Sequence, residues 1–293
     1  MTAQTIGVIG LGKIAMPIAI NLLASGYRVT GYRRSPMADF AKAGGAPLAS
    51  PAEVAEKSDF IVSCLPSPAA FDEVIAGPDG VMNTIRPGQI FLELGTYSLE
   101  VKERQRARLA QKGAILIDGE ISGTPGMVAS RKASVYLAGD EAACASAAGV
   151  VKGFADACAY FGVFGAAIQV KLIANLLVTI HIAAAGEAMA LGLKTGIDPK
   201  LLIGAIAAGA GNSAQFVARA PMMAERRFEP PLGSFEVLKH YFAPAKQMAG
   251  NLGVATPLFD RAIALYEKGI ADGFGGKDVA AIVEVIGAMP AKP

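Results

Sequence analysis

The sequence contains no tryptophan, only three cysteines and only two histidines among its 293 residues. Cys64, Cys144 and Cys158 are scattered and show no C-x-x-C spacing, which argues against a disulfide framework and for a reducing, cytoplasmic compartment. With His181 and His240 as the whole supply of imidazole, a histidine-rich metal site is excluded, and no metal is expected.

The chain also lacks a large excess of either charge: it has 27 basic and 25 acidic residues, and its net charge is +2. A nucleic-acid binder normally carries a basic stripe, and here the nearest feature is the pair Arg33 and Arg34. We therefore expect a small-molecule substrate and no nucleic-acid partner. The 53% of hydrophobic residues suits a chain with large buried interfaces and excludes general disorder.

Long uninterrupted apolar runs are missing, although the mean hydropathy is +0.42. The most apolar stretch, residues 165–193, is broken by polar and charged side chains, which are expensive in a membrane. We expect a buried helix between domains or subunits, no membrane association, and a homodimer or homotetramer. A strand pattern starts within a few residues of the N-terminus, so we expect no signal peptide.

The first half of the chain alternates short β-branched runs with amphipathic segments, which predicts an α/β fold with a doubly wound parallel sheet. Strands are expected at residues 6–9, 28–32, 60–64, 90–94 and 115–118, and further ones at 135–138 and 157–161. Helices are expected at residues 16–24, 51–57 and 99–112.

The second half has the pattern of an all-α domain. Strand-like alternation stops near residue 165, and alanine- and leucine-rich helical periodicity continues almost to the end. We predict a nucleotide-binding domain at residues 1–163 and a helical substrate and oligomerisation domain at residues 164–293, joined by a long helix.

A glycine-rich turn follows the first predicted strand and opens the first predicted helix. It fits G-x-G-x-x-G/A, in which Gly10 permits the tight turn, Gly12 admits a pyrophosphate and Ala15 allows close packing. The helix start supplies amide donors and a positive dipole end. The residues expected at the dinucleotide are Gly10, Leu11, Gly12, Lys13 and Ile14. A plain strand-to-helix turn is the alternative.

The end of the second predicted strand indicates which dinucleotide binds. An NAD site usually places an acidic residue there to bind the ribose 2′-hydroxyl, whereas this chain has Arg33, Arg34 and Ser35. Guanidinium groups bind phosphate through a bidentate fork, so the sequence favours NADP. A solvated basic turn is the alternative.

With these motifs the chain resembles the β-hydroxyacid dehydrogenase family, the group of 3-hydroxyisobutyrate dehydrogenase and tartronate semialdehyde reductase. The resemblance covers nearly the whole chain and implies a Rossmann-type domain followed by the helical domain. It rests on the glycine turn with Pro17 and Asn21, on Cys64-Leu65-Pro66, on Glu93-Leu94-Gly95-Thr96, on Ile121-Ser122-Gly123, on Gly165 to Asn175, and on Lys239.

The resemblance also implies residue roles. Leu65, Pro66 and Thr96 would lie near the nicotinamide end of the cofactor, and Lys239 would close over the site. The substrate carboxylate would be held by Ser122, Gly123 and Thr124. Lys171 would be the catalytic lysine, with Asn175 beside it.

The chain departs from the family pattern at several of these positions. Glu120 replaces a proline, Thr124 the second glycine of S-G-G, and Gly95 a serine. Ala174 replaces the first asparagine and His240 an aspartate. The catalytic skeleton is kept, while the substrate pocket is altered.

Lys171 and Asn175 are four residues apart and share one face of the predicted long helix. A lysine on an apolar helix loses solvation, which moves it toward proton transfer near neutral pH. The alternative is that Lys171 reaches solvent or pairs with Glu187.

Three functions compete on the sequence alone. The first is an oxidoreductase that acts on the CH-OH group of a small β-hydroxy acid, or on its semialdehyde or ketone, with Lys171 as general acid and base. The second is an imine reductase, a related group that commonly has Asp or Tyr at the lysine position. The third is a protein that binds NADP(H) without turnover.

Overall fold

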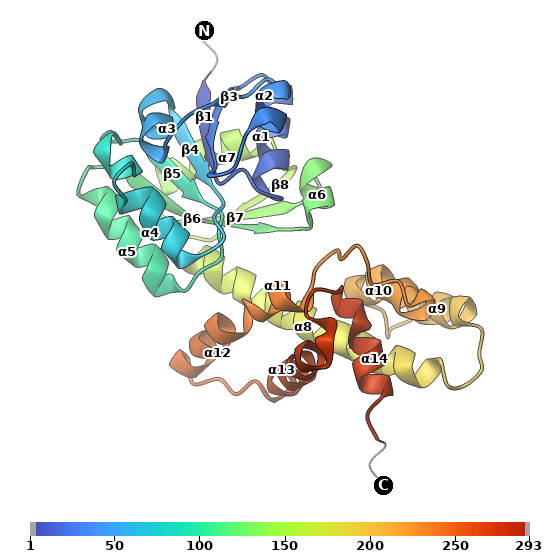
Figure 1. Cartoon of the computed structure of the whole chain (residues 1–293). Helices are drawn as coiled ribbons and strands as arrows, with labels where there is room; N and C mark the ends of the chain where they lie inside the picture. The colour runs from blue at the N-terminus through green and yellow to red at the C-terminus, as the bar shows by residue number, and fades with distance from the viewer. Residues whose placement is uncertain (1–3, 291–293) are drawn as a thin grey trace. The chain divides into compact units, whose positions relative to one another are not determined.

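The computed structural model describes residues 4–290. The chain folds into two compact units (Figure 1). The first unit ends at Lys171 and the second begins at Leu172, so the division falls inside the long helix α8 (Ala166–Gly192). The predicted boundary at residues 163/164 lies just before the start of that helix.

The first unit is built on one sheet of eight strands in the order β3-β2-β1-β4-β5-β6-β7-β8. The six strands from β3 to β6 are parallel and have the order of a doubly wound dinucleotide-binding sheet. The strands are β1 (Thr5–Ile9), β2 (Arg28–Tyr32), β3 (Ala46–Pro47), β4 (Phe60–Ser63), β5 (Ile90–Glu93), β6 (Ile115–Ser122), β7 (Ser134–Ala138) and β8 (Ala157–Tyr160).

All seven predicted strands are present, and two details of the prediction were wrong. β7 runs antiparallel to β6, because the chain between Ser122 and Ser134 holds only the five-residue helix α6 (Pro125–Ala129) and cannot make a crossover. The sixth strand also continues four residues beyond Asp118, because residues 118–122 pair with β7. Ser122 therefore ends a strand and does not lie in a loop.

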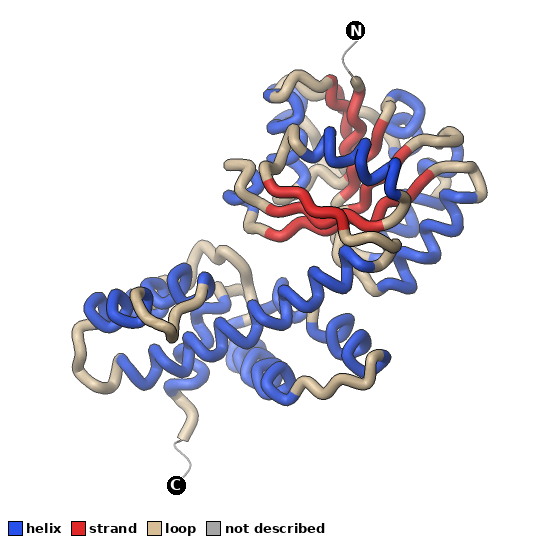
Figure 2. The backbone as a smooth tube through the Cα atoms, turned by 180° about the vertical axis from the view of Figure 1, so that it is seen from behind, coloured by secondary structure: helices blue, strands red, loops and turns tan. Residues whose placement is uncertain are grey.

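Helices cover both faces of this sheet (Figure 2). One apolar layer contains buried residues of α1 and α7, and the opposite layer contains those of α3, α4 and α5. These helices and the short ones between them are α1 (Ala15–Ala24), α2 (Ala38–Lys42), α3 (Pro51–Lys57), α4 (Pro68–Ala76), the 3₁₀ turn η1 (Val81–Asn83), α5 (Leu99–Ala110) and α7 (Glu141–Val151).

The second unit is helical, as predicted, and is packed around the C-terminal part of α8. Ile182 and Met189 of that helix are fully buried, and the Tyr266 hydroxyl donates to the Thr179 carbonyl oxygen over 3.0 Å. The helices are α9 (Pro199–Ala207), α10 (Ala214–Glu225), α11 (Phe235–Lys239), α12 (Phe242–Asn251), α13 (Pro257–Gly269), the π-helical turn η2 (Ile270–Phe274), the 3₁₀ turn η3 (Val279–Ala281) and α14 (Ile282–Gly287).

Among residues 4–290, α8 is the one helix whose length and composition would allow it to cross a membrane. Core helices of soluble proteins pass the same test, and α8 carries such buried core residues. The helix is therefore explained by packing within the second unit.

The turn from β1 to α1 requires glycine for two separate reasons. Gly10 has a φ of 88°, which L side chains rarely adopt, and a Cβ atom there would lie 2.5 Å from the Cys64 carbonyl oxygen at the end of β4. Gly26, after α1, has the same φ of 88°, but a Cβ atom there would meet nothing within 4 Å.

We predict that Gly10→Ala destabilises the protein more than Gly26→Ala does. The φ strain should cost about 1–2 kcal/mol in both variants. Crowding against the β4 backbone should cost Gly10→Ala a further ~1–3 kcal/mol. Urea unfolding of the two variants measures the difference, and equal losses would show that β4 moves aside freely.

Candidate functional site

A cavity of about 530 Å³ opens in the first unit at the carboxyl ends of β1, β2 and β4. This is where the strand order reverses between β1 and β4, the usual place for a ligand in an open α/β sheet. Nine of the residues predicted to bind cofactor line it: Gly10, Leu11, Gly12, Lys13, Ile14, Arg33, Arg34, Leu65 and Pro66.

The glycine turn has the shape that a pyrophosphate needs. The Gly12 amide donates to the Gly10 carbonyl oxygen over 2.6 Å, and α1 begins at Ala15. A Cβ atom at Gly12 would meet no atom closer than 3.8 Å, so a side chain there would occupy open space that the ligand needs. The bare backbone and the helix start together suit an anionic group.

The two arginines of the cavity are held differently. Arg33 donates to the carbonyl oxygens of Leu11, over 3.0 Å, and Pro36, and pairs with Asp39 over 2.5 Å. Its hydrogen bond lowers the pKa of the Asp39 carboxyl. The Arg34 side chain is 71% exposed and lies 3.8 Å from Glu73. Arg33 therefore braces the turn, while Arg34 projects more freely.

The turn after β4 forms another wall of the cavity. Leu65 is fixed from behind, because its carbonyl oxygen accepts from the Tyr97 hydroxyl over 2.8 Å. Burial raises the pKa of the neighbouring Cys64 thiol to about 12, so it stays neutral. Thr96, adjacent to Tyr97, does not line this cavity and instead joins a polar cluster behind the loop.

Gly95 is explained by its surroundings. A Cβ atom at this position would lie 2.5 Å from Glu93 Oε1 and would also collide with the Tyr97 hydroxyl. The Gly95 amide itself donates to Glu93 Oε1 over 2.6 Å. The family's serine does not fit here, because Glu93 and Tyr97 fill its space.

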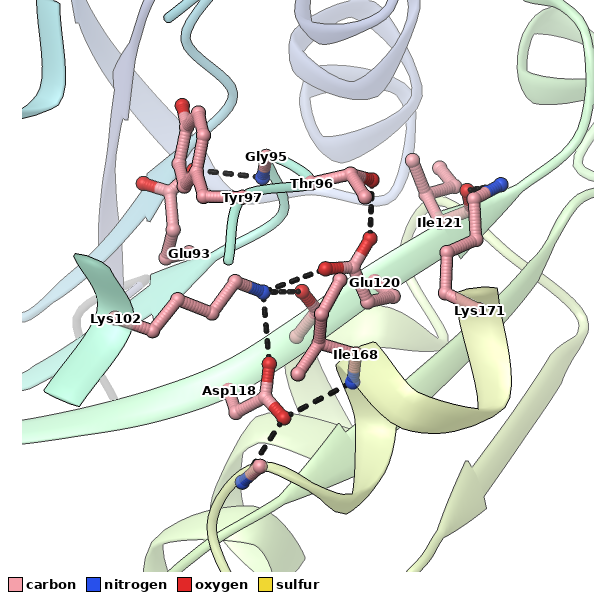
Figure 3. Close-up of polar contacts among 12 residues, drawn as sticks. Glu93, Gly95, Thr96, Tyr97, Lys102, Asp118, Glu120, Ile121, Ile168 and Lys171 are labelled. Atoms are coloured by element: carbon pink, nitrogen blue, oxygen red, sulfur yellow. Dashed lines mark hydrogen bonds and ion pairs between the residues drawn. The ribbon is translucent and has the colours of Figure 1, made fainter. Parts of the chain in front are cut away.

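A buried cluster of charges lies behind this loop (Figure 3). Lys102 of α5 has no exposed surface, and its Nζ contacts Asp118 at 2.7 Å, Glu120 at 2.6 Å and the Gly119 carbonyl oxygen at 3.0 Å. The two carboxylates raise the pKa of Lys102, which keeps it an ammonium ion. Three donor positions of the ammonium are thus matched by three acceptors.

Asp118 also fixes the start of α8. Its Oδ2 accepts from the backbone amides of Gly165 and Ile168, each over 3.1 Å. These amides belong to the first turn of the helix, where N–H groups lack partners and a negative charge is favoured. The Lys102 cluster is therefore connected through one side chain to the helix that carries Lys171.

Two other carboxylates complete the cluster. Glu120 Oε2 accepts from the Thr96 hydroxyl over 2.5 Å, and Glu93 accepts from the Ser63 hydroxyl. Burial raises the pKa of Glu120 and that of Glu93 to about 7, against the opposing effect of the Lys102 charge.

Lys171 lies on the first turns of α8, and its side chain is 7% exposed. Its Nζ donates to the Ile121 carbonyl oxygen of β6 over 2.9 Å (Figure 3). Burial lowers the pKa of Lys171, while the charges of Glu120 and Cys64 act in the opposite direction. A desolvated ammonium group with this balance is suited to proton transfer.

The predicted substrate segment continues directly from Ile121. Ser122 is the last residue of β6 and pairs with Ser134, while Gly123 is exposed and packs against Ala133. The Thr124 hydroxyl caps α6 by accepting from the Met127 amide over 3.3 Å. The strand fixes Ser122, and the cap orients Thr124.

Asn175 and Lys239 belong to the second unit. Asn175 lies one turn after Lys171 on α8 and is 8% exposed; among residues 4–290 its Nδ2 has no hydrogen-bond partner. Lys239 is exposed and ends α11, and His240 follows it as the C-terminal cap residue. Their part in a site stays a prediction.

Sequence reasoning missed Lys102 and Glu93 as members of the cluster. A usable signal existed, because Asp118 and Glu120 are two residues apart and so share one face of a fully buried strand. Two carboxylates there require a buried cation. In the part of the chain that the structure describes, no group of three His, Cys, Asp or Glu side chains is arranged to hold a metal ion.

The comparisons with known proteins agree with this geometry. Residues 5–162 match the family model described as the NAD binding domain of 6-phosphogluconate dehydrogenase. Residues 165–286 match the model described as NAD-binding of NADP-dependent 3-hydroxyisobutyrate dehydrogenase. Together the two models span both units.

Individual relatives are similar over most of their length. The chain is 31% identical over 286 residues to L-threonate dehydrogenase of Cupriavidus necator, covering 97% of this chain and 96% of that protein. It is 33% identical over 205 residues to mitochondrial 3-hydroxyisobutyrate dehydrogenase of Mus musculus, covering 69% of this chain and 61% of that protein.

A solved structure shows the same fold. The crystal structure of 3-hydroxyisobutyrate dehydrogenase from Salmonella typhimurium superposes with a TM-score of 0.86 at 26% identity, covering 96% of this chain and 99% of that one. Motifs, fold and relatives therefore place the chain in the β-hydroxyacid dehydrogenase family of nicotinamide-dependent oxidoreductases.

Proposed function

We propose that this enzyme uses NADP to interconvert a small β-hydroxy acid and its semialdehyde or ketone, with Lys171 as general acid and base. The observation that carries the proposal is the buried Lys171 side chain, whose Nζ is held by a 2.9 Å bond to Ile121, directly before the segment Ser122 to Thr124. A proton donor bonded to β6 and a carboxylate-binding segment at the end of that strand suit this class of substrate.

NADPH, when bound, would supply a hydride to the substrate's carbonyl carbon. As that bond forms, the electron pair of the C=O bond moves to the oxygen, which takes a proton from Lys171 Nζ. In the oxidation direction, neutral Lys171 removes the hydroxyl proton. The bond to Ile121 positions Nζ, and burial of the side chain lowers the cost of giving up the proton.

The substrate's acid group is assigned to the segment at the end of β6, the strand to which Lys171 is hydrogen-bonded. The Ser122 hydroxyl and the backbone at Gly123 and Thr124 offer donors that a carboxylate accepts. Asn175, one turn after Lys171 on α8, is a second candidate ligand donor, since its buried Nδ2 has no partner among the described residues 4–290. Relatives named for L-threonate and 3-hydroxyisobutyrate act on hydroxy acids of this kind.

The preference for NADP is assigned mainly to Arg34. Arg33 already satisfies two carbonyl oxygens and a carboxylate, which fixes the shape of the turn. Arg34, with Ser35 beside it, lines the same cavity and projects more freely, so its guanidinium can reach a 2′-phosphate.

We predict that NADPH binds more tightly than NADH and that Arg34→Gln removes most of this preference. Losing a charge-assisted contact to phosphate should weaken NADPH binding by about 1.5–3 kcal/mol and leave NADH binding almost unchanged. Fluorescence titration of both cofactors measures this.

Arg28→Gln is the matched control, because Arg28 lies at the opposite end of β2 and bonds to Thr5. It should leave the preference intact. Equal affinities of the unmodified protein for NADH and NADPH would contradict the assignment of the cofactor.

We predict that the enzyme oxidises NADPH faster with a carboxylate-bearing aldehyde than with the matched aldehyde that lacks the acid group.

Lys171→Ala should lower kcat by about 10²–10⁴-fold and leave NADPH affinity almost unchanged. Lys171→Arg should fail nearly as badly, since a guanidinium does not release its proton in this pH range. Steady-state kinetics on paired aldehydes tests both expectations.

Lys200→Ala is the control, because Lys200 is exposed on α9. Retained turnover in Lys171→Ala would show that another group donates the proton. Faster reduction of uncharged aldehydes in most pairs would contradict the acid substrate, and turnover of imines alone would make the protein an imine reductase.

A further inference from the structure

Glu120 is a buried carboxylate whose two oxygens have different partners. Oε1 contacts Lys102 Nζ at 2.6 Å, and Oε2 accepts from Thr96 Oγ1 over 2.5 Å. The residue has no exposed surface and immediately precedes Ile121, the partner of Lys171. It therefore lies between a loop predicted to meet the cofactor and the strand that holds the proton donor.

We propose that Glu120 is a positioning residue of the active site, which fixes the direction of the Thr96 hydroxyl and holds Lys171 in its ammonium form. The second part rests on the proposed function of Lys171. Neither part follows from the family's pattern, in which a proline stands at this place.

The bond to Glu120 determines what Thr96 can offer a ligand. A hydroxyl has one proton, and Thr96 gives it to the carboxylate, so its lone pairs alone are left for other partners. Thr96 is only partly buried, and it would accept from a donor on the bound cofactor or substrate, such as a hydroxyl or an amide. Protonated Glu120 would reverse this direction.

The anchoring of Glu120 explains how it can keep a negative charge in the interior. Lys102 contacts it directly, and that ammonium is itself shared with Asp118 and Gly119. Isolated buried carboxylates take up a proton, whereas a contacting cation favours the ionised form. Lys102 thus maintains a charge that Lys171 experiences.

Several charged or titratable groups face one another here from five elements. They are Lys102 of α5, Asp118 of β6, Glu93 of β5, Lys171 of α8 and Cys64 after β4. Of these neighbours, Glu120 and Cys64 favour the charged form of Lys171, and burial opposes them. Because the Cys64 thiol stays neutral, Glu120 is the one of these two neighbours whose charge favours the Lys171 ammonium.

The test is to measure the pKa of Lys171 directly, by NMR of protein labelled at the lysine side chains with Lys171→Met to assign the signal. Glu120→Gln should lower the Lys171 pKa by about one pH unit or more, because an opposite charge that favours the ammonium form is lost. As the pKa falls, the ammonium disappears at lower pH, so the alkaline limb of the reduction rate should move to lower pH by the same amount.

Three further variants separate the two parts of the proposal. Glu120→Asp keeps the charge and should restore most of the Lys171 pKa. Thr96→Val removes the hydroxyl alone, and should leave that pKa unchanged while weakening cofactor or substrate binding severalfold. Glu103→Gln, on the exposed side of α5, is the matched control and should change neither quantity.

An unchanged Lys171 pKa in Glu120→Gln would overturn the charge role, and unchanged ligand binding in Thr96→Val would overturn the hydroxyl role. If Glu120→Gln does not fold, Glu120→Met removes the same charge with an unbranched side chain of similar length that needs no hydrogen bond, and it should lower the Lys171 pKa in the same direction. The NMR measurement needs no turnover, so a protein that reduces no aldehyde but shows the shift would contradict the proposed function and leave this inference standing.

Discussion

The buried ammonium of Lys102 is the interaction on which the rest of the site depends. It joins α5 to β6 through Asp118 and Glu120, which would otherwise repel each other on one face of the strand. Asp118 then fixes the first turn of α8, and Glu120 fixes Thr96. Removing water from three ionised groups is costly, and the full set of hydrogen bonds offsets that cost.

Two of the departures from the family pattern, Glu120 and Gly95, lie at this cluster. Glu120 replaces a proline and meets Lys102, and Gly95 leaves room for Glu93 and Tyr97. Tyr97 in turn supports Leu65 at the cofactor cavity. Both substitutions therefore lie in the same polar core, while Lys171 keeps the position of the family's lysine on α8.

The fold was largely predictable because its signals are local. Buried strands, the glycine turn and the long helix depend on short stretches such as Gly10 to Ala15, and the structure contains them at the expected residues. The direction of β7 and the length of β6 depend on pairing between distant segments, and those expectations were wrong. The Lys102 cluster was missed because α5 and β6 meet only in three dimensions.

For single residues, too, the sequence predicted some features and not others. Lys171 was predicted from its helix and its resemblance to a family motif, yet its 2.9 Å bond to Ile121 could not be read from the sequence. Arg33 and Arg34 look equivalent in the sequence, whereas the structure shows one braced by Asp39 and the other exposed. Their tertiary contacts, and not their residue type, distinguish the two arginines.

A double-mutant cycle on Lys102 and Asp118 tests this account most directly. Lys102→Met should destabilise the protein by about 3–5 kcal/mol, because it leaves two buried carboxylates without their cation. Asp118→Asn should cost less, because Lys102 keeps its contact with Glu120. The double variant should lose at least ~1 kcal/mol less than the sum, within the usual range of coupling between contacting residues. Lys112→Met, on the surface after α5, serves as the control. Additive losses in the free energy of unfolding would show that the two charges do not depend on each other, and would contradict the account.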